Sequence, residues 1–224
     1  MVTDLGPLWL SLQVAAVTTL LLLVVGTPLA WWLARTHARI RPVIEALTAL
    51  PLVLPPTVLG FYMLILFSPT APLGALWLGA TGSTLTFSFS GLVLASALYS
   101  LPFTVQPLQA AFEAVGSAPL EAAATLGAGP LDRFLSVATP LAARGYLTAA
   151  VLTMAHTLGE FGVVLMVGGN IPGRTQVVSI AIYERVETID YAAAHLLSAI
   201  LLGLSFGVLL LVYTLNRRFP VRVA

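Results

Sequence analysis

Charged side chains interrupt the hydrophobic pattern of this chain at only a few places. Residues 5–34 and residues 46–112 contain no Asp, Glu, Lys or Arg. Because an α-helix rises about 1.5 Å per residue, about 20 apolar residues are enough to cross a bilayer. The first run therefore predicts one membrane-spanning helix at 9–33. The second run is too long for one helix and must fold back on itself.

The stretch 68–86 is rich in Pro, Gly and Ser, which is typical of a turn, and it divides the second run. The other predicted spans are then 44–67, 87–110, 141–167 and 193–215. Backbone polar groups in lipid must be satisfied within their own segment, so each span is expected to be helical. The pattern predicts an all-α integral membrane protein with five spans in a single domain, residues 1–224.

Composition supports this interpretation and excludes several other classes of protein. Hydrophobic residues make up 58% of the chain and charged residues only 8%, with a mean hydropathy of +0.98. Soluble domains usually carry about 25% charged residues, so a soluble enzyme, a disordered tail and a nucleic-acid-binding module are excluded. The absence of Cys excludes disulfides and thiolate metal sites, and leaves the redox compartment open.

The distribution of the basic residues predicts the topology. All ten are Arg, and eight of them fall on one side of a five-span arrangement. The eight are Arg35, Arg39, Arg41, Arg133, Arg144, Arg217, Arg218 and Arg222. The positive-inside rule then places the N-terminus outside and the C-terminus in the cytoplasm. It also makes 111–140 the main cytoplasmic loop and 168–192 the main outer loop.

The cytoplasmic loop predicts a short helix followed by a second one. Pro119 and Glu121 suit a first helical turn, 122–124 is a run of Ala, and Gly127 suits the C-terminal end. Pro130 is then positioned to begin the second helix. On composition alone the loop is compatible with a plain connection between two spans, but a short alanine-faced helix also suits the groove of a partner protein.

This loop resembles the "EAA" signature of permease subunits of ATP-binding-cassette importers. The matching residues are Glu121, Ala122, Ala123, Gly127, Val137 and Pro140. Val137 and Thr139 stand where the signature has Ile and Leu. The resemblance implies a coupling helix between spans three and four that docks on a cytoplasmic ATPase, and a type I importer fold. The implied coupling residues are Glu121, Ala122, Ala123, Ala124, Gly127 and Pro140.

Three further stretches resemble the molybdate and sulfate permeases of this family. They are 50–60, with its three prolines, 156–162, similar to "SLGEFG", and 169–175 followed by 181–183. The resemblance implies the permease of an oxyanion importer in the bacterial inner membrane, with molybdate as the expected cargo. Sulfate or thiosulfate and tungstate remain alternatives.

The same resemblance implies the partners. They are a second copy of the chain, two cytoplasmic ATPase subunits and an extracytoplasmic oxyanion-binding protein. The chain has no Lys and therefore no Walker A motif, so ATP and magnesium are expected in the ATPase and no cofactor or catalytic residue in this chain. The binding protein is expected to dock on the outer loop at Asn170, Pro172, Gly173 and Arg174.

Two places inside the predicted spans carry residues that disturb a regular helix. The prolines near the start of 44–67 indicate either a helix boundary or a bend that lines a pathway. In 141–167, Glu160 is an acid at membrane depth, and His156 one turn earlier is a candidate partner. A bare carboxylate would repel an anionic cargo, so we expect a structural or gating role for Glu160. The pathway or gate candidates are Pro55, Pro56, Thr57, Gly159, Glu160 and Gly162.

Arg144 lies at the cytoplasmic start of 141–167, and the interiors of the predicted spans contain no other Arg, which limits how tightly they can hold an oxyanion. A tight site would use Arg or several charge-assisted donors. The spans offer only hydroxyls and amides, among them Thr57, Ser100, Thr104, Gln106 and Gln109. We therefore expect affinity and selectivity to lie in the binding protein.

Two other classes of function were compared with this interpretation. An ion-coupled secondary transporter usually shows repeats, broken helices and a charged coupling site at mid-membrane, and no repeat is found here. An intramembrane hydrolase needs a Ser nucleophile beside a His base. His195 and Ser198 share a helix face, but no oxyanion-hole context accompanies them. We also expect no metal site.

Overall fold

The computed structural model describes residues 5–218, and this part of the chain forms helices and loops without a strand. Arg222, which was counted for the topology, lies outside it. The first helices are α1 Gly6–Arg35, α2 Arg41–Val53, α3 Pro56–Phe67, α4 Pro72–Thr81, α5 Phe89–Val115 and α6 Ala118–Thr125. They are followed by α7 Pro130–Asp132, a π-helical turn Arg133–Ala138, α8 Thr139–Leu141, α9 Ala143–Gly159, α10 Gly162–Gly168, α11 Val178–Glu187 and α12 Tyr191–Arg218.

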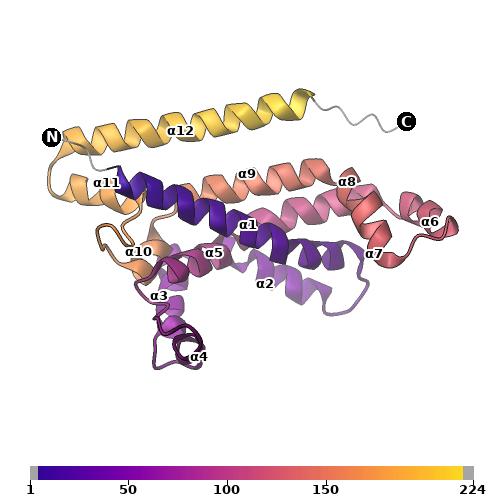
Figure 1. Ribbon diagram of the computed structural model, residues 1–224, viewed down its shortest axis with the longest axis horizontal. Coiled ribbons are helices and arrows are strands. Elements are labelled where there is room, and N and C mark those ends of the chain that lie inside the picture. The colour runs from indigo at the N-terminus through magenta and orange to yellow at the C-terminus, as the bar shows by residue number, and fades with distance from the viewer. Residues whose placement is uncertain (1–4, 219–224) are drawn as a thin grey trace.

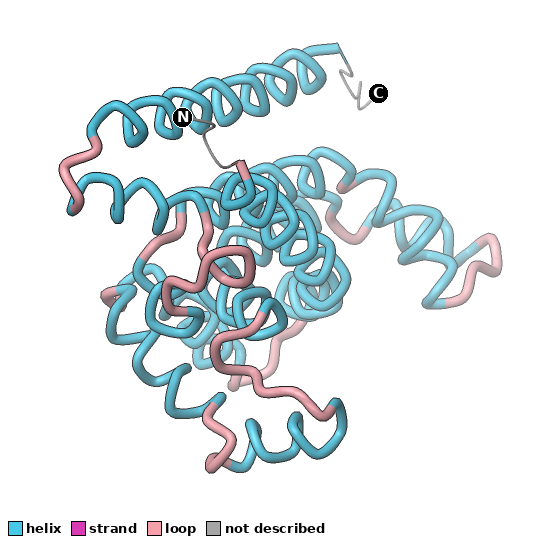
Figure 2. The backbone as a smooth tube through the Cα atoms, turned by 60° about the vertical axis from the view of Figure 1, so that its left-hand side comes forward, coloured by secondary structure: helices cyan, strands magenta, loops and turns pink. Residues whose placement is uncertain are grey.

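Helices α1, α5 and α9 pack against one another and form the centre of the bundle (Figure 2). Leu33, Leu108 and Phe112 are fully buried in the largest hydrophobic cluster, which all three helices share. Gly145 of α9 lies directly against Ala111 of α5, where a β-carbon would collide. Small residues at such contacts let two membrane helices approach closely, since no side chain separates their backbones.

The two ends of the bundle carry different elements (Figure 1). The short helices α6, α7 and α8 gather at one end, and α10, α11 and the start of α12 lie at the other. The last turn of α1, with Arg35, lies at the same end as α6. The predicted cytoplasmic loop and the predicted outer loop therefore lie at opposite ends of the molecule.

Three helices are long and apolar enough to cross a membrane: Gly6–Arg35, Phe89–Val115 and Tyr191–Leu210. They correspond to the predicted spans 9–33, 87–110 and 193–215. Two bent helix pairs bring the count of possible spans to five within the described part of the chain. One pair joins α2 and α3 at 112°, and the other joins 130–141 to α9 at 70°.

The predicted span at 44–67 is a bent pair of helices, because the chain breaks between α2 and α3 at the prolines. Leu54 has ψ 136° and Pro55 has ψ 135°, so two successive residues are extended. Each of them precedes a proline, whose ring disfavours the helical conformation of the residue before it, and neither Pro55 nor Pro56 has an N–H to donate to a helix. Pro55 and Pro56 thus end one helix and begin another in a new direction.

The predicted span at 141–167 is also not one continuous helix. Helix α9 ends at Gly159, and α10 begins at Gly162 after an extended Glu160, whose ψ is 135°. No proline marks this break. The predicted turn at 68–86 and the outer loop at 168–192 contain α4 and α11, two short helices that were not predicted.

Candidate functional site

Both helix breaks border one cavity of about 580 Å³. Its lining residues are Pro56, Thr57, Tyr99, Ala155, His156, Gly159, Glu160, Phe161, Gly162, Leu165 and Met166. Five of the six predicted pathway or gate residues are in this set, although they come from segments about a hundred positions apart in the sequence. Pro55, the sixth, lies one residue outside the lining. The structure therefore brings the two disturbed stretches together.

A close contact between α3 and α10 forms one border of the cavity. A β-carbon on Gly162 would lie 2.8 Å from the Cβ of Pro56, and one on Gly60 would lie 2.8 Å from the Cβ of Met166. Carbon atoms do not approach so closely, so only glycine fits at both positions. A β-carbon on Gly159, by contrast, would meet nothing within 4 Å. The sequence did not single out Gly60, because nothing local marks its distant partner.

The break between α9 and α10 is tied to α11. The Ser179 hydroxyl donates a 2.6 Å hydrogen bond to the carbonyl of Glu160, a group that the interrupted helix leaves free. Thus α11, at one end of the bundle, stabilises the backbone beside the cavity. Ser179 was not expected to have this role, since it is 19 positions from Glu160 in the sequence.

The Glu160 side chain is only 4% exposed, and neither carboxyl oxygen has a hydrogen-bond partner among the described residues. Ser96 of α5 is the hydroxyl that faces it, but their geometry does not complete a hydrogen bond. A buried polar group without a partner costs free energy, about 1–3 kcal/mol. The surrounding packing must therefore hold this carboxyl in place.

The predicted pairing of His156 with Glu160 is wrong. His156 Nδ1 lies 2.9 Å from Ser100 Oγ, and its ring stacks on Phe103 with 4.1 Å between centroids. Both partners belong to α5, so the imidazole turns toward that helix and away from the acid one turn later. The sequence rule for neighbours on one helix missed this, because the stronger partners come from another helix.

A ladder of buried hydroxyls joins α5 to α9. Thr104 and Thr153 share a hydrogen bond of 2.6 Å, and Ser100 and Thr157 share one of 3.1 Å. All four side chains are buried. Ser100 and Thr104 were considered as groups along the cargo path, but they lie in this helix interface. Of the hydroxyls considered, Thr57 is the one that lines the cavity.

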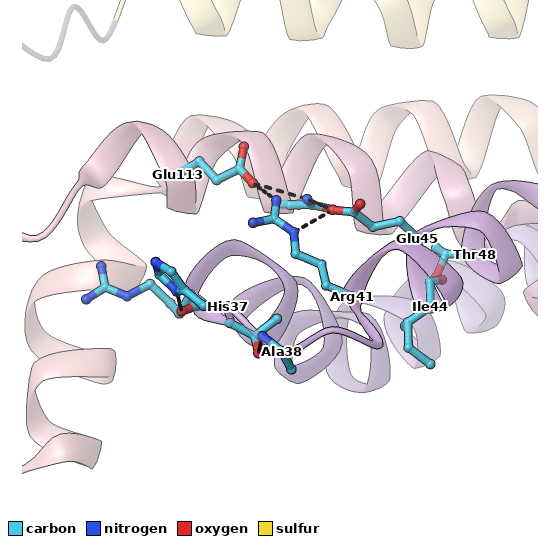
Figure 3. A network of polar contacts seen from close by, with 10 residues as sticks. His37, Ala38, Arg41, Ile44, Glu45, Thr48 and Glu113 are labelled. Carbon is cyan, nitrogen blue, oxygen red and sulfur yellow. Dashed lines mark hydrogen bonds and ion pairs between the residues drawn. The ribbon is translucent and has the colours of Figure 1, made fainter.

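At the opposite end, a charged network joins α2 to α5 (Figure 3). Arg41 donates from Nε to Glu45 and from Nη2 to Glu113, both at 2.8 Å. Gln109 also donates to both carboxylates. Glu113 lies near the end of α5, directly before α6. The network therefore links the first half of the broken span to the segment that leads into the predicted coupling helix.

The predicted coupling helix is present as α6, Ala118–Thr125. Glu121, Ala122 and Ala124 are exposed, Ala123 is half-buried, and Leu120 is buried against the bundle. Gly127 has φ +91°, a left-handed conformation that favours glycine, and its N–H bonds to the carbonyl of Ala124.

The rest of the cytoplasmic segment leads back to the bundle. Pro130 begins α7, as predicted, and Pro140 lies in α8 after the π-helical turn. Phe134 packs on Trp31 of α1, with ring centroids 5.1 Å apart. Three leucines on this segment remain exposed outside the long apolar helices: Leu126, Leu131 and Leu135. An exposed apolar patch of this kind is typical of a protein–protein contact.

The four predicted docking residues of the outer loop, Asn170, Pro172, Gly173 and Arg174, are all exposed. Gln176 Nε2 donates to Asn170 Oδ1 at 2.8 Å and holds that part of the loop.

Acidic and basic side chains follow on α11 and beyond it. The Tyr183 hydroxyl donates to Glu187, and this hydrogen bond raises the pKa of Tyr183 above its usual range. Arg185 forms an ion pair with Asp190 at 3.5 Å. Within the described residues, no three His, Asp or Glu side chains gather in a way that could hold a metal ion.

The family model of the binding-protein-dependent transport system inner membrane component matches residues 26–220. The molybdenum transport system permease protein ModB of Azotobacter vinelandii is 56% identical over 96% of this chain and 95% of its own length. ModB of Escherichia coli K12 is 36% identical over 80% of this chain and 78% of its own. The sulfate transport system permease protein CysT of the same organism is 35% identical over 89% and 72%.

Among solved structures, the inward-facing MetNI methionine ABC transporter matches with a TM-score of 0.73. The match covers 95% of this chain and 94% of that one, at 18% identity. It shows that the fold is that of a type I importer permease, as the sequence predicted, and carries no information on cargo.

Proposed function

This chain belongs to the family of binding-protein-dependent transport system inner membrane components, and we propose that it is the membrane-spanning permease subunit of an ATP-driven molybdate importer. The observation that carries the proposal is the 56% identity to the Azotobacter vinelandii molybdenum permease over nearly the whole chain. The sulfate permease of Escherichia coli is more distant, at 35%. The chain is thus a multi-pass protein of the bacterial inner membrane.

We infer that the cavity between the two breaks is part of the cargo path. Irregular backbone at membrane depth is tolerated where it is buried in protein or lines a cavity, and both breaks lie at this one. The lining contains no Arg, and its hydroxyl groups are those of Thr57 and Tyr99. Such a wall lets an oxyanion pass but holds it weakly, so selectivity is assigned to an extracytoplasmic binding protein that docks at Asn170, Pro172, Gly173 and Arg174.

Energy comes from a separate ATPase in this proposal, which binds ATP and magnesium. We assign the ATPase-binding surface to the exposed face of α6, from Glu121 to Ala124, and to the exposed leucines that follow it. Family membership implies two copies of the chain, two ATPase subunits and one binding protein. The N-terminus lies outside and the Arg-rich end faces the cytoplasm.

The connection from α6 to the cavity runs through α5 and α2. Arg35 Nη1 donates to the carbonyl of Gly116 at 3.0 Å, and Arg41 binds Glu113, so the end of α5 is tied to α1 and to α2. When the ATPase moves α6, the end of α5 and the start of α2 move with it. Because α3 follows α2 directly, the motion reaches the cavity wall. Alternating access is then a rigid-body change between two arrangements.

The proposal is tested with the chain reconstituted in vesicles together with its ATPase and binding protein. We expect molybdate, added with the binding protein, to stimulate ATP hydrolysis and to accumulate inside the vesicles, while sulfate is taken up poorly. If sulfate is taken up as well as molybdate, the cargo assignment is wrong. If the purified chain fails to co-elute with the ATPase, the coupling assignment is wrong.

A glycine pair tests the coupling helix itself. Gly127 has φ +91°, where a side chain costs about 1–2 kcal/mol, whereas Gly129 has φ −71° and a β-carbon added there would meet nothing within 4 Å. We expect Gly127→Leu to leave ATP hydrolysis running but to reduce uptake per ATP by about tenfold or more, since a distorted helix end no longer seats in the ATPase. Gly129→Leu is the matched control, and equal loss in both variants would contradict the assignment.

A further inference from the structure

Two arginines from distant parts of the chain line one small cavity at the cytoplasmic end of the bundle. The cavity has a volume of about 170 Å³, and its lining residues are Trp31, Arg35, Leu120, Pro130 and Arg133. Neither guanidinium takes part in an ion pair within the described residues. The lining of this cavity therefore contains two positive charges and no carboxylate.

Arg133 is the less satisfied of the two. Its Nε is buried and has no hydrogen-bond partner in the described part of the chain. The neighbouring acid, Asp132, accepts a 2.7 Å hydrogen bond from Ser136. Phe134 packs against the rings of Trp31 and Phe112, which holds this stretch of backbone in place. A cationic donor buried without an acceptor is costly, so the site is incomplete as it stands.

Arg35 is fixed in position on the other side of the cavity. It donates from Nη1 to the carbonyl of Gly116 at 3.0 Å, and its guanidinium lies over the Trp31 ring, 5.3 Å from the centroid. A guanidinium carries five N–H donors, so most of its donors are still available. The guanidinium of Arg35 is therefore fixed in position and still has free N–H donors for an anion.

We propose that this cavity binds the tetrahedral oxyanion of a phosphate-type group between Arg35 and Arg133. Planar guanidinium groups bind phosphate oxygens with strong, charge-assisted hydrogen bonds. The volume exceeds the roughly 30 Å³ that one water occupies in the liquid and accommodates a group of a few atoms. The anion is either the phosphate of an anionic lipid or a free inorganic oxyanion in the cytoplasm.

The position of the cavity gives such binding a structural effect. Arg35 ends α1, Leu120 belongs to α6, and Pro130 and Arg133 follow in the segment after it. An anion held by both arginines would tie the predicted coupling segment to the central bundle. The site thus makes the position of α6 sensitive to an anion that is not being transported, whatever the cargo is.

The test uses the assembled transporter, this chain with its ATPase, in lipid nanodiscs. One arm places it in phosphatidylcholine with added phosphatidylglycerol and counts retained phosphatidylglycerol by native mass spectrometry. The other arm uses phosphatidylcholine alone, titrates inorganic phosphate, and follows tryptophan emission, with Trp31→Phe identifying the signal from the cavity. Retention of lipid in the first arm identifies a lipid source, and a saturable response in the second identifies a free anion.

The variant that decides the matter is Arg133→Gln, with Arg39→Gln as the matched control. Arg39 is an exposed arginine on the same side, and its removal lowers the charge of this end equally. We expect Arg133→Gln to weaken binding about tenfold, because a hydrogen bond to a charged group is lost, and Arg39→Gln to change it by less than about twofold.

Three results would overturn the proposal. Equal loss in the two variants would mean that only the general charge of the surface attracts the anion. No saturable binding in either arm would mean that the cavity takes no anion. Unchanged binding in Arg133→Gln would mean that Arg133 does not hold the anion.

Discussion

The two breaks that border the cavity are made in different ways. The break between α2 and α3 is determined by the local sequence, since the two successive prolines Pro55 and Pro56 disfavour a helical conformation of the residues before them and supply no N–H donor. The break between α9 and α10 has no proline. It depends on a hydrogen bond from Ser179 and on a contact between Gly162 and Pro56 that forms only in the folded chain. One wall of the cavity is thus set by the sequence near it, and the other by tertiary structure.

This difference makes the second break the more vulnerable of the two. A proline restricts its neighbours in any conformation of the chain, whereas a hydrogen bond or a glycine contact acts only when its partner is present. Substitutions far from Glu160 in the sequence should therefore alter the second break and leave the first intact. The predictions below follow from this asymmetry.

The largest effect is expected at the contact between the two walls. Gly162→Ala would place a β-carbon 2.8 Å from the Cβ of Pro56, and overpacking of this kind costs about 1–3 kcal/mol. We expect a lower unfolding temperature of the purified chain and strongly reduced uptake. Gly159→Ala, three residues away in open space, is the control and should be tolerated. Similar behaviour of the two variants would show that the close contact is unimportant.

The next effect concerns the tie from α11. Ser179→Ala removes the hydrogen bond to the Glu160 carbonyl, which is worth about 0.5–1.5 kcal/mol. Amide hydrogen exchange in residues 160–165 should become roughly two- to tenfold faster, because local opening is easier. Exchange in residues 54–59, at the proline-made break, should not change. Faster exchange at both breaks would mean that they are not independently stabilised.

A smaller effect is expected in the continuous helices between the breaks. Thr104 and Thr153 share a buried hydrogen bond of 2.6 Å, and such bonds between membrane helices contribute about 0.6 kcal/mol on average. A double-mutant cycle with Thr104→Val and Thr153→Val, read by thermal unfolding, should return a coupling energy of about this size. A coupling energy near zero would show that the ladder does not hold α5 to α9.

The smallest effect is expected at the acid inside the second break. Glu160→Gln keeps the shape of the side chain and removes a buried group that can carry charge but has no partner. The preference for molybdate over sulfate should remain unchanged in the uptake assay, because selectivity is assigned to the binding protein. A shift toward sulfate would show that Glu160 contacts the cargo and that the second break takes part in selection.

The sequence predicted those features that depend on length, charge and local conformation. Three long helices and α6, with Gly127 after it, follow from uncharged runs and from residues suited to helix ends. The second break was missed because 141–167 contains no proline. A long apolar stretch predicts one helix, and the contacts that interrupt this one form only in the folded chain. The helices within 68–86 and 168–192 were missed because Pro, Gly and charged residues suggested plain loops.

The candidate site was predicted in part for the same reason. Pro56 and Glu160 were marked by their unusual chemistry in a membrane, and Thr57, Gly159 and Gly162 by the family resemblance of the stretches around them, and the structure gathers all five at one cavity. Their neighbours Gly60, Ser179 and Tyr99 are ordinary residues in the sequence. They matter because of what they touch, and a single sequence does not display contacts between distant segments.

The hydroxyl ladder has a mechanical consequence. Its rungs recur one helical turn apart on both helices, at Ser100 and Thr104 on one and at Thr157 and Thr153 on the other. Sliding α9 along α5 by a fraction of a turn would break both rungs together, and the next matching register lies about 5.4 Å away. The two helices therefore favour discrete positions along each other over a continuous range of sliding. We therefore expect a displacement of α9 at the cytoplasmic end to carry α5 with it.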